Sequence, residues 1–310
     1  MDFYNMYNQK IPFYKVRNFG DKVSVTFSFF QQNLRYIWKY LLYTICPVGI
    51  IFGVGMNWFY SSSMSDFKDS DISTATAIGT SVATLFGGII MTVGMAVVLA
   101  MIFALMQLYN ERDNGLQGIT FEEIKPYMIN NFWRVIKYAL SVIVFFVAAS
   151  IVFVLLALFL QWFVLLLVIP AVIILFVVVQ LILPVYMFED ISIWDAWQRG
   201  IKLSWKTFGG VLALAIVFAL ITDIVGSVFS IPWAVCFFIK ALALTEDTVS
   251  AMATSPMFNT ITYILAMLMG VGTFALSLLT YVAMSYQYSN AAEQEDAFSV
   301  QDDINDFNNL

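Results

Sequence analysis

The longest uncharged stretch of this chain constrains its fold more than any other feature. From Tyr138 to Phe188 the sequence runs 51 residues without Asp, Glu, Lys or Arg. A membrane-spanning helix needs about 20 mainly apolar residues to cross roughly 30 Å of hydrocarbon. The stretch is therefore long enough to cross a bilayer, turn and cross back. Charged residues make up only 12% of the chain, against about 25% in soluble domains. The sequence predicts a polytopic membrane protein.

Six apolar segments of spanning length follow one another along the chain. They predict an all-α membrane helical bundle in which six transmembrane helices form three hairpins. A basic, aromatic leader (1–35) precedes this membrane domain (36–287). An acidic tail (288–310) follows it, and its charge and composition predict a disordered cytoplasmic segment. The predicted spans cover residues 36–59, 77–108, 137–160, 163–187, 208–231 and 258–286.

The distribution of Lys and Arg predicts the orientation. Cytoplasmic loops of membrane proteins carry an excess of these residues. Of the 15 Lys and Arg in the chain, only Lys68 and Lys240 fall in the first, third and fifth loops. The leader and the two remaining loops carry the others. We therefore expect both termini in the cytoplasm and the chain in the inner (plasma) membrane of a bacterial cell.

Apolar residues recur with the spacing i, i+3, i+7, i+11, i+14 ahead of the first, third and fifth spans. Residues so spaced share one face of a helix, while basic residues such as Arg199, Lys202 and Lys206 project elsewhere. This pattern is typical of a helix that lies in the headgroup plane and binds anionic lipid. We expect each hairpin to follow such a cytoplasmic interfacial helix. Two alternatives remain: chance matches in so apolar a chain, and a strand at 23–29, where apolar residues alternate. The three copies are Phe27, Phe30, Leu34, Trp38, Leu41; Phe121, Ile124, Met128, Phe132, Val135; and Trp194, Trp197, Ile201, Trp205, Phe208.

The second predicted span carries a small residue at every fourth position from Thr76 to Ala104. Small residues let helix backbones approach closely. We expect close packing along this stripe, and the alternative is a pore lined by its hydroxyl groups.

Residues 184–211, PVYMFEDISIWDAWQRGIKLSWKTFGGV, carry a family resemblance. The segment is similar to bacterial multispan families related to the membrane domain that is fused to some glycerophosphodiester phosphodiesterases. Gly200 stands where those families usually have Ser. The resemblance implies an integral membrane module. The phosphodiesterase activity of fused relatives belongs to a soluble barrel with His and carboxylate metal ligands, so we do not expect it in this chain, which has no His. The matching residues are Glu189, Ala196, Trp197, Arg199, Leu203 and Phe208.

Several reactive groups are missing from the sequence. Without histidine the chain has no Ser-His or Cys-His nucleophile and no His-ligated zinc. Cys46 and Cys236 lack other soft ligands for a metal. HExxH, Walker, GxGxxG and CxxC motifs do not occur. We therefore expect a non-enzymatic protein without metal or cofactor. The Lys and Arg are scattered beside membrane segments, which argues against nucleic-acid binding.

Two acids are candidate functional residues. Asp223 lies well inside the fifth span, where a charge costs about 2.5–3.5 kcal/mol and usually faces protein or water. It is a candidate proton or cation relay, although hydration near the outer end of the span or a Thr partner is the alternative. Glu189, with Asp190 and Asp195, precedes or opens the third amphipathic segment. Acids there complement the helix dipole or cap the helix, and the alternative is an acid-lined entrance to a lipid or ion path.

The leading functional hypothesis is an integral inner-membrane protein that organises or senses the bilayer, or scaffolds other membrane proteins. Its tail is a candidate binding site for a protein partner, because Val300, Ile304 and Phe307 would align on one helical face. The alternative is a transporter or channel for a small or amphiphilic solute that uses Asp223. Lone acids inside spans and Pro-broken helices are common in transporters, but three hairpins do not form their usual inverted pairs.

Overall fold

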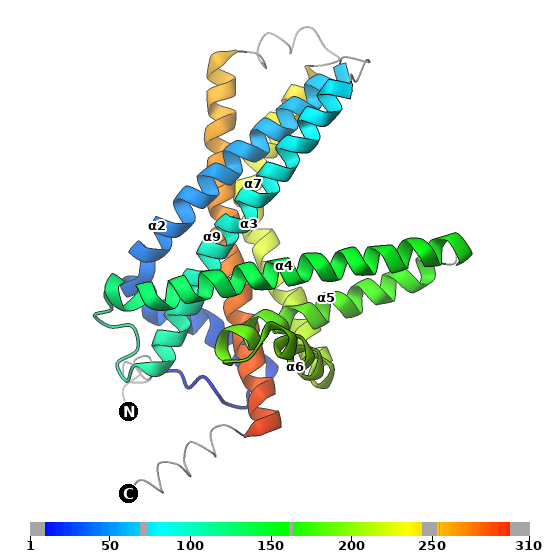
Figure 1. Ribbon diagram of the computed structural model, residues 1–310. Helices are drawn as coiled ribbons and strands as arrows, with labels where there is room; N and C mark the ends of the chain where they lie inside the picture. Colours follow the sequence, from blue (N-terminus) through cyan, green and yellow to red (C-terminus); the bar gives the residue numbers. More distant parts are fainter. Residues whose placement is uncertain (1–9, 69–73, 161–163, 244–252, 254, 298–310) are drawn as a thin grey trace, which may run out of the picture. The chain divides into compact units, whose positions relative to one another are not determined.

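The computed structural model describes residues 10–68, 74–160, 164–243, 253 and 255–297. In these ranges every regular element is a helix, so the predicted all-α class is confirmed (Figure 1). The helices are α2 (Phe19–Lys68), α3 (Thr74–Glu111), α4 (Phe121–Leu160), α5 (Val164–Phe188), α6 (Ile193–Lys206), α7 (Phe208–Leu242) and α9 (Pro256–Asp296).

Six of the described helices are long and apolar enough to cross a membrane: all but α6. Five of the predicted spans fall within one of these helices, and the fourth (163–187) does so from residue 164 onward. The turn expected at residues 161–162 lies outside the described residues. Length and composition thus support a multi-pass membrane protein.

The three predicted interfacial segments differ in the structure. The first is continuous with its span in α2, and the second is continuous with its span in α4. Residues 23–29, whose alternation left a strand open, are helical within α2. Only the third segment is a separate helix, α6, because the helical conformation breaks at Thr207, the C-cap of α6, before α7 begins.

The last helix continues beyond the point where the sequence predicted a disordered tail. Residues 288–296 form the end of α9. Tyr288, Ala291 and Ala292 are buried there, so tertiary contacts order a segment that its own charge would leave unfolded. The expected partner-binding residues at 300–307 lie outside the described residues.

The chain divides into two compact units. The first comprises Met1–Trp38, Leu99–Ala219 and Leu279–Leu310. Within it, α4 lies beside α5, and α6 folds back onto α5 (Figure 1). The two helices approach closely at Gly200, where a Cβ atom would lie 2.8 Å from Ile182 Cγ1 and 2.9 Å from Ile182 Cα. This contact explains the small residue at position 200.

The second unit comprises Lys39–Val98 and Leu220–Leu278. Here α2 and α9 approach until their backbones touch. A Cβ atom on Gly53 would lie 2.0 Å from Ala266 O, and one on Gly270 would lie 2.0 Å from Gly49 O. The pairs Gly49/Gly53 and Ala266/Gly270 are both spaced by four residues, which is the arrangement that brings membrane helices into direct contact.

Among the side chains that the structure describes, the small-residue stripe in α3 is closely packed in the second half of the helix. Ala96, Ala100 and Ala104 are fully buried. By contrast, a Cβ atom on Gly88 would meet nothing within 4 Å. The predicted close packing is therefore observed for the second half of the helix.

Candidate functional site

The candidate site lies in the first unit, where α5 ends and the chain turns into α6. The Glu189 N–H donates to Val185 O at 2.9 Å, which closes the last turn of α5. Ser192 then caps α6: its Oγ accepts from the Asp195 N–H at 3.2 Å and donates to Asp195 Oδ2 at 2.7 Å. The cap is therefore Ser192, and Asp195 lies in the first turn of α6, the position in which the sequence predicted an acid that complements the helix dipole.

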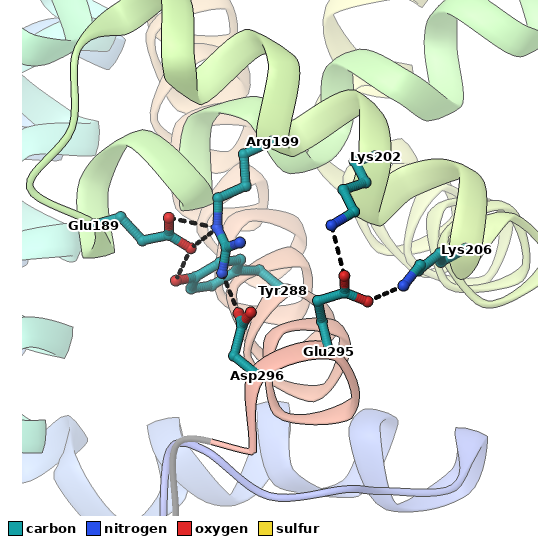
Figure 2. Close-up of polar contacts among 7 residues, drawn as sticks. All are labelled: Glu189, Arg199, Lys202, Lys206, Tyr288, Glu295 and Asp296. Carbon is teal, nitrogen blue, oxygen red and sulfur yellow. Dashed lines mark hydrogen bonds and ion pairs between the residues drawn. The ribbon is translucent and has the colours of Figure 1, made fainter. Parts of the chain in front are cut away.

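Glu189 is bound by residues of two helices (Figure 2). The Arg199 Nε of α6 donates to Glu189 Oε1 at 2.5 Å, and the Tyr288 hydroxyl of α9 donates to the same oxygen at 2.9 Å. Arg199 also pairs with Asp296 through its second guanidinium nitrogen. One guanidinium therefore joins the end of α5 to the end of α9, and it does so through partly shielded groups, since the Glu189 side chain is 14% exposed.

Two lysines extend this contact along α6. Lys202 Nζ lies 2.6 Å from Glu295 Oε1, and Lys206 pairs with the other oxygen of the same carboxylate (Figure 2). Both lysine side chains are more than half exposed, whereas Glu295 is 16% exposed. We call the ion pairs of Arg199 with Asp296, and of Lys202 and Lys206 with Glu295, the latch.

Contacts from other helices fix the end of α5. Arg134 of α4 donates to the Glu189 carbonyl at 2.6 Å, and its guanidinium lies 4.5 Å from the centre of the Tyr186 ring. The Phe188 and Tyr288 rings stack with their centroids 5.9 Å apart. Arg134 and the packed aromatic rings thus fix the position of Glu189 at the end of α5.

The electrostatics of the cluster favour the ionised pair. Burial alone would lower the pKa of Arg199, but the hydrogen bonds and negative charges of Glu189 and Asp296 outweigh it and raise the pKa above its ordinary value. The Arg199 guanidinium forms ion pairs with the carboxylates of both Glu189 and Asp296. This arrangement holds the ends of α5 and α9 to α6, and Glu189 has a positioning role within it.

The outward surface of α6 has a separate character. The face formed by Ala196, Trp197, Gly200 and Leu203 is buried, and the Trp197 Nε1 donates to Ser141 Oγ of α4 at 3.0 Å. On another face Trp194 and Trp205 are 70% and 54% exposed. They are eleven residues apart, which places them on one side of a helix. α6 therefore has a buried face, a basic edge and an exposed tryptophan face.

The other predicted candidate, Asp223, belongs to the second unit and takes no part in this cluster. It lies near the middle of α7, because that helix continues to Leu242 and not only to the predicted end at residue 231. Asp223 is exposed, and no described residue forms a hydrogen bond or ion pair with it. Asp223 therefore lies farther from the end of its helix than the predicted span suggested, and both the relay and its alternative, hydration or a Thr partner, stay predictions.

Sequence reasoning missed the α9 half of the cluster. Tyr288, Glu295 and Asp296 lie in a segment that was expected to be disordered. A signal was present: Arg199, Lys202 and Lys206 share one edge of α6, and acids follow the last span. Pairing these basic residues with Glu295 and Asp296 required the knowledge that α9 ends beside α6. Among the described residues, no group of three or more His, Cys, Asp or Glu is placed to hold a metal ion.

Comparisons with known proteins add no relative. No model of a protein family matches the chain, and neither the curated proteins nor the solved structures show significant similarity to it. The resemblance of residues 184–211 to the phosphodiesterase-associated membrane families therefore stays a prediction.

Proposed function

We propose that this protein is a non-enzymatic integral protein of a bacterial inner membrane that senses or organises the bilayer, or scaffolds other membrane proteins. In this proposal both termini lie in the cytoplasm, and α6 lies at the cytoplasmic membrane surface. The surface of α6 carries the proposal: it has an exposed Trp face beside a basic edge that is occupied by the acids of α9. The family resemblance around α6 agrees with a membrane module.

The tryptophan face supports a position at the membrane surface. Tryptophan is enriched at the level of lipid headgroups, because its ring is apolar while its N–H is polar. Trp194 and Trp205 are exposed on a helix that follows one apolar span and precedes another. We infer that these rings anchor α6 at the interface while its buried face packs on α5.

The latch supports a sensing role. Lys202 and Lys206 are largely exposed, and exposed ion pairs contribute only about 0–1 kcal/mol each. Anionic headgroups near the same lysines compete with Glu295, since each Lys near a charged membrane surface contributes about 1 kcal/mol of attraction. The Arg199–Glu189 pair is better shielded. We infer that anionic lipid loosens the end of α9 from α6 while α6 stays attached to α5.

Hydrogen–deuterium exchange of the full chain in nanodiscs tests this function. We expect the amides of residues 289–297 to exchange up to about fivefold faster in phosphatidylglycerol than in phosphatidylcholine, which corresponds to about 1 kcal/mol. The double variant Lys202→Gln/Lys206→Gln should exchange fast in both lipids. Lys125→Gln is the matched control, because this exposed lysine of α4 lies outside the latch, and it should keep the lipid dependence. Equal exchange of the wild-type chain in both lipids would contradict the proposal.

Transport of a small or amphiphilic solute is the second candidate function. It is favoured by Asp223, an exposed acid near the middle of a spanning helix, since a charge there is costly and usually faces water or a partner. Asp223→Asn removes the charge and keeps the shape. In reconstituted vesicles, solute or proton flux that the variant abolishes would support transport, whereas flux that the variant leaves unchanged would exclude a role for this residue.

A further inference from the structure

A small polar pocket lies at the end of α3, within the first unit and apart from the latch. Its volume is about 170 Å³. Residues from the leader, from α2 and from the loop that follows α3 line it. They include Lys10, Gln32, Asn33, Tyr36, Tyr109 and Asp113.

Buried polar groups form part of the wall. Asn33 and Tyr109 are 3% and 5% exposed. The Tyr109 hydroxyl accepts from the Ile11 N–H at 2.8 Å and donates to Gln32 Oε1 at 3.3 Å. The leader, α2 and α3 are thus tied together by a tyrosine whose hydroxyl faces other polar groups, and this side of the pocket is fixed in place.

The loop at the other side is also held in one conformation. Arg112 donates to Gln117 O at 2.9 Å and pairs with Glu123 of α4. Leu116, which belongs to this loop, is fully buried. Gly115 has φ +58°, a conformation that suits glycine, and a Cβ atom there would lie 3.1 Å from the Tyr109 ring. The pocket is therefore preformed, which lowers the entropic cost of binding.

The charges in the pocket identify the kind of ligand. Lys10 supplies one positive charge, with Nζ donating to Asn110 O at 2.5 Å. Asp113 supplies one negative charge, and the remaining polar side chains are amides and phenols. One charge of each sign suits a zwitterion better than an anion, which Asp113 would repel, or a cation, which Lys10 would repel. The volume is smaller than the 300–1,000 Å³ typical of pockets for drug-sized ligands, so only a small group fits.

The position of the pocket indicates where such a group comes from. The apolar part of α3 ends at Glu111, and the polar loop begins directly after it. Tyr36 and Tyr109 lie at this boundary, as tyrosines do at the headgroup level of membranes. A phospholipid headgroup would reach the pocket from the side while its acyl chains stay in the bilayer.

We propose that this pocket binds a zwitterion that joins a phosphate to a primary ammonium, the chemistry of a phosphoethanolamine headgroup. Lys10 and the amide side chains bind the phosphate, and the Asp113 carboxylate binds the ammonium. The site goes beyond the role proposed for α6. It uses none of the latch residues, so either proposal can fail alone.

Binding of short-chain lipids to the purified full chain in detergent tests the site. We expect dihexanoyl phosphatidylethanolamine to bind about tenfold more tightly than the phosphatidylcholine and phosphatidylglycerol analogues, because of the three only its headgroup has a cationic N–H donor for a charge-assisted hydrogen bond to the carboxylate. Asp113→Asn should remove this preference, and Lys10→Gln should weaken binding of the same lipid. Asp190→Asn is the matched control, since that carboxylate is fully exposed outside the pocket, and it should bind like the wild type.

Free phosphoethanolamine in a parallel titration distinguishes the sources of the ligand. Tight binding of the lipid alone assigns the site to a membrane headgroup, and equally tight binding of the free compound assigns it to a soluble zwitterion. Both results support the shared chemistry. Equal affinities for the three lipids, or unchanged preference in an Asp113→Asn protein that elutes like the wild type, would overturn the proposal.

Discussion

Replacing Gly53 by alanine tests the backbone contact between α2 and α9. The added Cβ atom would lie 2.0 Å from Ala266 O and 2.5 Å from Ala266 C. Contacts between carbon and oxygen need about 3.3 Å, so the two helices must separate by about 1 Å. Because the obstacle is backbone, no rotation of a side chain relieves it. Gly55→Ala is a matched control in the same helix, since a Cβ atom there meets nothing within 4 Å.

The magnitude follows from two opposing effects. A gap of 0.5–1 Å forfeits a quarter to a half of the dispersion energy between the separated surfaces, and overpacking costs about 1–3 kcal/mol. Alanine gains up to about 1 kcal/mol over glycine in helix propensity. Gly53→Ala is therefore destabilising on balance, whereas Gly55→Ala is neutral or stabilising. The two variants should differ by about 2 kcal/mol or more in the free energy of unfolding.

Thermal unfolding in detergent, followed by tryptophan fluorescence, measures this difference. Trp233 packs in one cluster with Ala266 and so reports on the contact. We expect the Tm of Gly53→Ala to lie at least about 4 °C below that of Gly55→Ala. Gly270→Ala should resemble Gly53→Ala, because its Cβ atom would lie 2.0 Å from Gly49 O. Equal Tm values for the Gly53 and Gly55 variants would refute the close approach of these helices.

Two further predictions concern the charged cluster. Arg199→Gln should lower the free energy of unfolding by about 1–3 kcal/mol, because it leaves a shielded carboxylate without its cation, whereas Lys206→Gln at an exposed pair should cost at most about 1 kcal/mol. Chemical denaturation in mixed micelles compares them, and equal losses would contradict the difference in shielding. Ser192→Ala should cost about 1 kcal/mol by removing the cap of α6, and Ser192→Thr, which keeps the hydroxyl, should restore most of it in the same measurement. An unchanged stability of the alanine variant would show that the cap contributes nothing.

The class of the protein and the approximate location of its spans could be predicted from local sequence alone. An uncharged run such as 138–188 allows few structures, because in lipid every backbone polar group must be satisfied within the segment. The place of Asp195 in the first turn of α6 was also predicted, since the preference for an acid there depends only on residues near the start of the helix. Such features are local, and local chemistry is enough to predict them.

Tertiary structure decided which of these residues meet. The sequence drew attention to the small residues of α3, yet the backbone contact in the second unit is made by Gly49, Gly53 and Gly270. It gave Glu189 a capping role, but α9 supplies Tyr288 as a hydrogen-bond donor to its carboxylate. Small residues recur along this chain, and each small or charged residue is compatible with several neighbours. Only the packing of helices distant in sequence selects the neighbour, because contact energy depends on separations of a few tenths of an ångström that residue spacing does not encode.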